Sequence, residues 1–235
     1  MKVAVNQSNY LPWKGYFDII NSVDLFVFYD DVQYTSRDWR NRNRIKTQHG
    51  PQWLTVPCSA SRDRMICEVS ISNTIWQKKH WKSLVHNYQN STYFETYKPF
   101  FEEIYNGPTW THLSELNQHL IKSISQEILG IKTRFVDSRQ FHLIGRKGVR
   151  ILDLLTQCEA TSYLSGPAAR QYLDEEQFDD IGIELEWMDY DGYPEYEQLF
   201  PPFDHYVSIV DLLFNKGPHA TDFMLSFHPK IPSPQ

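Results

Sequence analysis

The 235-residue chain has little cysteine, with only Cys58, Cys67 and Cys158. Their number is odd and they form no C-x-x-C pair, so we expect neither a disulfide framework nor a metal site built on cysteine. No stretch approaches the ~18 consecutive apolar residues of a membrane helix, and residues 1–5 lead into no longer apolar signal segment. These absences predict a cytoplasmic protein that does not enter the membrane.

Several motifs of known chemistry are also missing. The sequence has no Walker P-loop, no G-x-G-x-x-G, no G-x-S-x-G elbow and no H-E-x-x-H zinc motif. Any function must therefore be sought in other groups of residues.

The composition is that of a folded protein, with 41% hydrophobic and 15% aromatic residues. A net charge of −6 argues against general coating of nucleic acid. The charges are unevenly distributed, however. Residues 37–46 contain five cationic side chains and one acidic one, whereas residues 174–197 contain eleven acidic side chains and no Lys or Arg. The acidic run fits a solvated face.

The order of predicted elements indicates an α/β fold. Residues 2–6 and 24–29 read as strands and residues 17–20 as a short helix between them, which is a βαβ unit. We therefore expect a Rossmann-like, mainly parallel sheet with helices on both faces. Residues 75–88, 94–105 and 113–129 have helical periodicity and form a helical middle segment, with Gly130 as its cap.

The remaining elements complete this plan. Further strands are predicted at 52–57, 65–71, 133–136, 161–164 and 183–187, and further helices at 149–155 and 208–214. We expect an N-terminal α/β half (1–74), a helical segment (75–130) and a C-terminal α/β half (131–225), all in one compact domain. A tail follows at 226–235.

The loop after the first strand is the first candidate site. It gathers amide, phenol and indole groups, and ligands of open α/β sheets sit at the carboxyl ends of strands. The alternative is an apolar plug over the sheet. The candidate binding residues are Gln7, Asn9, Tyr10, Trp13, Gly15 and Tyr16.

Two acidic residues, Asp30 and Asp31, end the second predicted strand. A carboxylate there could bind a ribose hydroxyl, hold Mg²⁺ or act as a base, or it could simply cap a turn. Adjacent side chains point to opposite sides, so at most one faces a cleft. His80 lies on a helix face beside Trp76, where a buried structural role competes with a catalytic one.

The basic segment 37–44 is the strongest anion site in the sequence. Guanidinium groups interleaved with amides and an indole suit phosphate clamping and stacking on a base or sugar. The alternative is a solvated surface loop. The candidate binding residues here are Arg37, Trp39, Arg40, Asn41 and Arg42.

Two smaller candidates lie near the C-terminus. Ser165 and Gly166 follow a predicted strand and could offer backbone amides to an anion, or merely form a tight turn. Asn215 stands where the helix at 208–214 stops, before Gly217.

Six blocks of sequence in order resemble the WbqC-like protein family of bacterial polysaccharide gene clusters. They are QSNYLPWKGYF (7–17), FVFYDDVQY (26–34), RDWRNRN (37–43), WLTVP (53–57), YLSGPA (163–168) and DLLFNKGP (211–218). The family pattern usually has Pro where Ser8 stands and an acidic residue where His219 stands.

The resemblance implies a glycine transferase of O-antigen and lipopolysaccharide biosynthesis, which forms an amide on a nucleotide-linked amino sugar. Asp30 or Asp31 would then accept the proton of the amine, with His80 as second candidate. The basic segment would hold a pyrophosphate, and Tyr10 and Trp13 would stack on sugar or base. The donor would be glycine activated with ATP and Mg²⁺, or glycyl-tRNA.

Two other functions stay open at this point. One is a non-catalytic protein that binds nucleotide-sugars or RNA. The other is a Mg²⁺-dependent nucleotidyltransferase that uses Asp30 or Asp31.

Overall fold

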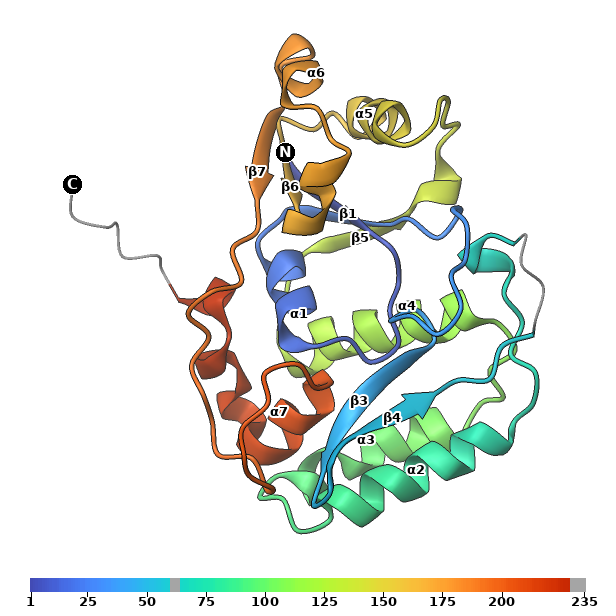
Figure 1. The fold of residues 1–235 in the computed structure, drawn as a ribbon, viewed down its shortest axis with the longest axis vertical. Helices are drawn as coiled ribbons and strands as arrows, with labels where there is room; N and C mark the ends of the chain where they lie inside the picture. The colour runs from blue at the N-terminus through green and yellow to red at the C-terminus, as the bar shows by residue number, and fades with distance from the viewer. Residues whose placement is uncertain (60–63, 229–235) are drawn as a thin grey trace.

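A five-stranded parallel sheet forms one half of the molecule (Figure 1). The computed structural model describes residues 1–59 and 64–228. The sheet order is β5-β2-β1-β6-β7. Strands β2 and β5 therefore lie on one side of β1, and β6 and β7 lie on the other. The strands are β1 (Lys2–Asn6), β2 (Leu25–Phe28), β5 (Arg134–Asp137), β6 (Ser162–Ser165) and β7 (Glu184–Trp187). This is the Rossmann-like α/β fold predicted from the sequence, and its order reverses between β1 and β6.

Both faces of this sheet are buried because successive strand residues alternate between them. Leu25 and Val27 pack on the face covered by α5 (Gly148–Gln157) and α6 (Glu175–Asp180). Phe26 and Phe28 pack on the other face, against α1 (Lys14–Asn21) and α4 (Leu113–Ser123). A parallel sheet covered on both sides explains why β2 is a continuous apolar run.

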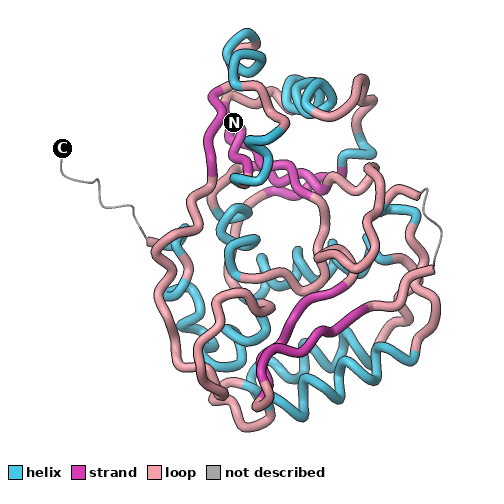
Figure 2. The backbone as a smooth tube through the Cα atoms, in the orientation of Figure 1, coloured by secondary structure: helices cyan, strands magenta, loops and turns pink. Residues whose placement is uncertain are grey.

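An antiparallel hairpin and three helices form the other half of the molecule. Strands β3 (Arg42–Thr47) and β4 (Gly50–Thr55) form the hairpin, which is the second group of strands in Figure 2. Gly50 follows its two-residue turn with φ of 98°, in the region that favours glycine. The hairpin packs against α2 (Ile75–Tyr88) and α7 (Ile209–Lys216), and α3 (Phe94–Asn106) packs against both of these helices (Figure 1).

Several sequence predictions are confirmed. The strand at 2–6 and the helix at 75–88 have the predicted bounds, and the other predicted helices and sheet strands differ from the structure by a few residues at their ends. Gly130 has φ of 69°, as expected of a helix cap. No helix within residues 1–59 and 64–228 is long and apolar enough to cross a membrane.

Two predictions are wrong. The basic segment is not a loop throughout, because residues 42–47 form β3. Residues 65–71 contain only isolated bridges around a 3-10 turn instead of a strand. The structure also has a short helix that was not predicted, α6, in the acidic run; its cap Asp174 accepts a hydrogen bond from the backbone N–H of Glu176. The helix predicted at 113–129 ends as α4 and continues as a π-helical turn, Ile124–Ile128.

Short 3-10 helices occupy several connections between these elements. They are Ile66–Glu68, Ser138–Gln140, Pro167–Gln171, Gly217–Phe223 and Leu225–Phe227. The tail predicted at 226–235 lies outside the described residues from 229 onward.

Candidate functional site

The loop after β1 and the basic segment are packed against each other. The backbone N–H of Tyr10 donates to the carbonyl of Trp39 at 3.0 Å. The side-chain amide of Asn43 donates to the carbonyl of Leu11 at 2.7 Å. Asn117 of α4 adds a third tie, because its amide donates to the carbonyl of Arg40 at 2.8 Å. Two segments that are separate in the sequence therefore form one surface.

This surface contains a cavity of about 250 Å³, which we call the inner hollow. The wall contains aromatic rings and amides and no ionised side chain. Its lining residues are Asn9, Pro12, Trp13, Trp39, Asn43 and Tyr206. Asn43 uses its amide to hold the loop, whereas the Oδ1 atom of Asn9 is buried without a hydrogen-bond partner among the described residues. Asn9 is thus a polar residue of the inner hollow whose side-chain amide has no partner among the described residues.

Trp13 forms the aromatic side of the inner hollow. Its ring centre lies 5.2 Å from that of Tyr190, 5.6 Å from Tyr193 and 6.0 Å from Tyr206. The indole folds over Gly15, where a Cβ atom would stand 2.3 Å from a ring carbon. Glycine is therefore required at position 15 for this placement of Trp13.

A second cavity of about 380 Å³ shares one lining residue with the first, and we call it the outer hollow. Trp39 lines both. Strand β3 supplies two of its arginines, because alternation along the strand puts Arg42 and Arg44 on the side away from the buried Asn43 and Ile45. The lining residues of the outer hollow are Arg37, Asp38, Trp39, Arg42, Arg44 and Trp53.

The outer hollow has an excess of positive charge. Asp38 is its one carboxylate, and Arg40 pairs with it at 2.5 Å. Among the described residues, neither Arg37 nor Arg42 nor Arg44 forms an ion pair with a carboxylate. Unpaired guanidinium groups on one surface suit an anionic ligand, phosphate above all.

Asp38 holds the turn that presents this charge. Its carboxylate also accepts from Thr35 Oγ1 at 2.7 Å and from the backbone N–H of Trp39 at 2.6 Å. These bonds stabilise a turn in which Arg37 has φ of 57°, a left-handed conformation that costs an L residue roughly 1–2 kcal/mol. Asp38 therefore stabilises the turn through contacts with its own neighbours in the chain.

Indole rings and guanidinium groups are stacked in the outer hollow. The ring centres of Trp39 and Trp53 lie 5.4 Å apart, and the guanidinium carbon of Arg42 lies 4.1 Å from the Trp53 ring centre. Both indoles are about two-fifths exposed. Exposed indoles beside arginine are the usual surface for stacking a nucleobase.

Asp30 lies beneath the loop after β1 and lines neither hollow. It is fully buried, and its carboxylate accepts from the backbone N–H of Ser8 at 2.8 Å, from the Ser114 hydroxyl and from the Gln118 amide at 3.2 Å. Burial raises the pKa of Asp30, and the donated hydrogen bonds oppose that rise. Gln118 also donates to Asp137 at 2.8 Å, so the network joins the carboxyl ends of β2 and β5.

Asp31 points away from Asp30, as predicted for neighbouring residues at a strand end. It pairs with Arg150 of α5 at 2.6 Å and accepts from the Ser138 hydroxyl at 2.5 Å. The two carboxylates therefore belong to different networks.

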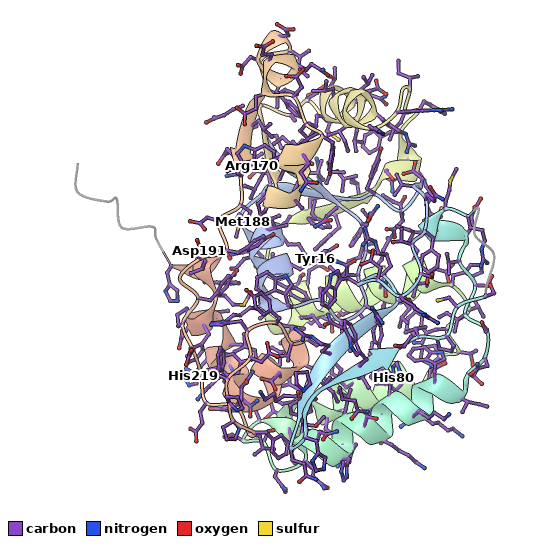
Figure 3. The ribbon with its side chains drawn as sticks, viewed as in Figure 1. Tyr16, His80, Arg170, Met188, Asp191 and His219 are labelled. Carbon is purple, nitrogen blue, oxygen red and sulfur yellow. The ribbon has the colours of Figure 1, made fainter. Side chains whose placement is uncertain are left out.

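His80 lies on α2, outside the five-stranded sheet and beside the β3–β4 hairpin (Figure 3). Its Nδ1 atom shares a hydrogen bond of 2.8 Å with the Tyr10 hydroxyl, and Tyr105 bonds the same hydroxyl at 2.5 Å. Burial lowers the pKa of His80 to about 4, so the ring is neutral near pH 7. His80 and Tyr10 together support the loop after β1 from below.

The other predicted residues are distributed around these features. The Tyr16 hydroxyl donates to the carbonyl of Gln7 at 2.8 Å, inside the loop after β1. Ser165 and Gly166 lie at the carboxyl end of β6, where the strand order reverses. Asn215 donates within α7 to the carbonyl of Asp211. A third cavity, of about 790 Å³, includes Asn41 and Arg37 in its lining.

The structure thus unites part of the predicted site. Asn9, Trp13 and Trp39 line the inner hollow, and Arg37, Trp39 and Arg42 line the outer one. The other predicted site residues, the three catalytic candidates among them, line neither hollow. Within residues 1–59 and 64–228, no group of three His, Cys, Asp or Glu side chains is placed to hold a metal ion.

Sequence reasoning missed Trp53 and Tyr206. A signal for Trp53 was available, because pairing 42–47 with 50–55 across a two-residue turn puts Arg44 opposite Trp53. Tyr206 is brought in by the long segment after β7, whose path no local pattern reveals. Its carbonyl accepts from Arg44 at 2.8 Å.

Comparison with known proteins covers almost the whole chain. The pattern of the WbqC-like protein family matches residues 7–223. The uncharacterized protein Rv1507c of Mycobacterium tuberculosis (strain ATCC 25618 / H37Rv) is 48% identical over 225 residues, which are 95% of this chain and 97% of that protein. No solved structure matches the chain. Since the family match spans the loop after β1, the basic segment and the core that joins them, the chain belongs to the WbqC-like protein family.

Proposed function

We propose that the protein is an acyl- or aminoacyltransferase that forms an amide on the amine of a nucleotide-linked amino sugar, in the synthesis of a surface polysaccharide such as O-antigen. One observation supports this proposal most. A charge-free cavity lined by the unpartnered amide of Asn9 and a guanidinium-lined cavity share Trp39 as a wall. A nucleotide-linked sugar likewise has an uncharged part, the sugar, and a charged part, the diphosphate.

The reaction joins the amine nitrogen to the acyl carbon. The C–N bond forms, the bond from the acyl carbon to its activating oxygen breaks, and the leaving group is AMP or the 3′-hydroxyl of a tRNA. One proton leaves the attacking amine, because only the neutral amine is a nucleophile. Glycine activated with ATP and Mg²⁺, or glycyl-tRNA, is the proposed donor.

Asp30 is the first proposed proton acceptor, and its link to the inner hollow is indirect. It binds the backbone of Ser8, the neighbour of Asn9. Its raised pKa brings it closer to the range of a base that works near neutral pH. Asp31 and His80 are the alternatives, and both are held in hydrogen bonds elsewhere.

The test is a transfer assay with purified protein. UDP- and dTDP-linked amino sugars are incubated with glycine, ATP and Mg²⁺, or with glycyl-tRNA, and the sugar nucleotides are analysed by mass spectrometry. We expect one sugar nucleotide to gain a glycyl group. If every combination of sugar and donor leaves the sugar nucleotides unchanged, the transferase proposal is wrong.

A second function, binding without catalysis, has one observation in its favour. All three catalytic candidates are engaged in internal hydrogen bonds. A nucleotide-sugar binding protein would retain sugar-nucleotide affinity in the assay samples that show no transfer.

A further inference from the structure

The outer hollow has the chemistry of a site for a nucleoside diphosphate. Arg37, Arg42 and Arg44 bring three guanidinium groups to one cavity, without a carboxylate partner for any of them in the described part of the chain. Because guanidinium groups bind phosphate oxygens in pairs of parallel hydrogen bonds, three such groups without a carboxylate partner suit a diphosphate.

The same cavity has a surface on which a base can stack. Trp53 is 42% exposed although Arg42 lies against its ring at 4.1 Å, and Trp39 stands 5.4 Å away. Stacking on indole needs only a flat π surface, so it tolerates different bases. Phosphate donors and a stacking surface lie side by side.

The inner hollow is unsuited to the phosphates and suited to the sugar. No Lys, Arg, Asp or Glu is among its lining residues. The Trp13 ring offers an apolar wall, and the unpartnered side-chain amide of Asn9 is a polar group beside it that can bind a hydroxyl or amino group. A charged diphosphate placed here would lose water without gaining a cationic partner.

We propose that the bound sugar nucleotide has a fixed direction: the nucleoside diphosphate lies in the outer hollow on Trp53 and Arg42, and the sugar lies in the inner hollow beside Asn9. Trp39 separates the two parts. This inference rests on the proposed function for the identity of the ligand. It further assigns Trp53 and Asn9 to different ends of that ligand.

Isothermal titration calorimetry at one fixed salt concentration tests the direction. UDP, dTDP and their amino-sugar derivatives are titrated into the wild-type protein and into three site variants, Arg42→Ala, Trp53→Ala and Asn9→Ala. Arg134→Ala is the matched control, because Arg134 is exposed at the amino end of β5 and far from both hollows. Trp53→Phe retains an apolar ring, and circular dichroism verifies that each variant is folded.

The direction predicts different losses for the two ends. Arg42→Ala and Trp53→Ala each weaken UDP or dTDP binding about tenfold or more, or ~1.4 kcal/mol, with a smaller loss in Trp53→Phe. Asn9→Ala leaves the free diphosphates unaffected and weakens only the amino-sugar derivatives. Arg134→Ala binds every ligand as the wild type does.

Three outcomes would overturn the inference. One is the reverse pattern, with free UDP and dTDP weakened by Asn9→Ala and not by Arg42→Ala. Another is binding of tRNA, without either diphosphate, that Arg42→Ala and Trp53→Ala abolish. The third is glycyl transfer at the wild-type rate by both Arg42→Ala and Trp53→Ala. That result would overturn the direction of binding and leave the proposed function intact. Conversely, the predicted binding pattern without transfer supports the direction and refutes the transferase.

Discussion

Replacing Gly15 by alanine tests whether Trp13 is locked over the start of α1. A Cβ atom at position 15 would lie 2.3, 2.7 and 2.7 Å from three atoms of the Trp13 ring, well inside contact distance. The ring would have to turn away, and it would leave its neighbours Tyr190, Tyr193 and Tyr206. The inner hollow would lose one wall.

The size of the effect follows from two opposing terms. Alanine in place of glycine within a helix is worth up to ~1 kcal/mol of added stability. Against this, three aromatic contacts are each worth roughly 0.5–1.5 kcal/mol, and overpacking costs about 1–3 kcal/mol. We expect Gly15→Ala to lower the free energy of unfolding by about 1–3 kcal/mol.

Urea unfolding followed by far-UV circular dichroism measures this change. Gly148→Ala is the matched control, because Gly148 also begins a helix and its added Cβ would meet nothing closer than 3.7 Å. The control should be neutral or slightly stabilised. If Gly15→Ala gains as much stability as Gly148→Ala, the placement of Trp13 is wrong.

Three further changes test the buried networks. His80→Gln should reduce the pH dependence of stability: the folded protein holds the pKa of His80 at about 4, below its ordinary 6.5, so the unfolded chain binds the extra proton between pH 6.5 and 4 and the wild type loses up to ~3 kcal/mol in that window as pH falls. Asp30→Asn should cost about 1–3 kcal/mol in urea unfolding, because an amide nitrogen would face the donors Ser8, Ser114 and Gln118. The pair Asp31 and Arg150 should show a coupling energy of about 1 kcal/mol in a double-mutant cycle, smaller in high salt.

Each of these has its own contradicting result. For His80, a slope of stability against pH that is the same in wild type and variant between pH 4 and 6.5 contradicts the buried neutral ring. For Asp30, wild-type stability of the Asn variant means that the carboxylate is not needed by its three donors. For the ion pair, additive single and double variants show that Arg150 and Asp31 are independent.

The sheet and α2 could be predicted because the sequence pattern of each element shows which of its faces are buried. In β2, four consecutive apolar residues mark a strand buried on both faces. In α2, Trp76, His80, Leu84 and Tyr88 repeat at intervals of four, and all are buried. Burial that is visible in the local pattern is what makes these elements predictable.

Strand β3 was missed because its buried side is partly polar. Asn43 faces inward to hold the loop after β1, so the expected alternation of apolar and polar residues is concealed. The basic composition of 37–46 suggests a solvated loop for the same reason. A polar contact between β3 and the loop after β1 overrides the ordinary strand pattern here.

The candidate site could be predicted only in its residue types. The loop after β1 and the arginines are unusual enough to be recognised in the sequence. Whether Asp30 faces a ligand or the interior depends on Ser114 and Gln118, which lie more than 80 residues away on α4. No local pattern contains that information.

The most direct test of the ligand site is a crystal structure of the protein with a UDP- or dTDP-linked amino sugar. We predict that the diphosphate contacts Arg42 and that the sugar lies between Trp13 and Asn9. A ligand bound away from Trp39, for example at the ends of β1 and β6 alone, would contradict the site that the two hollows define.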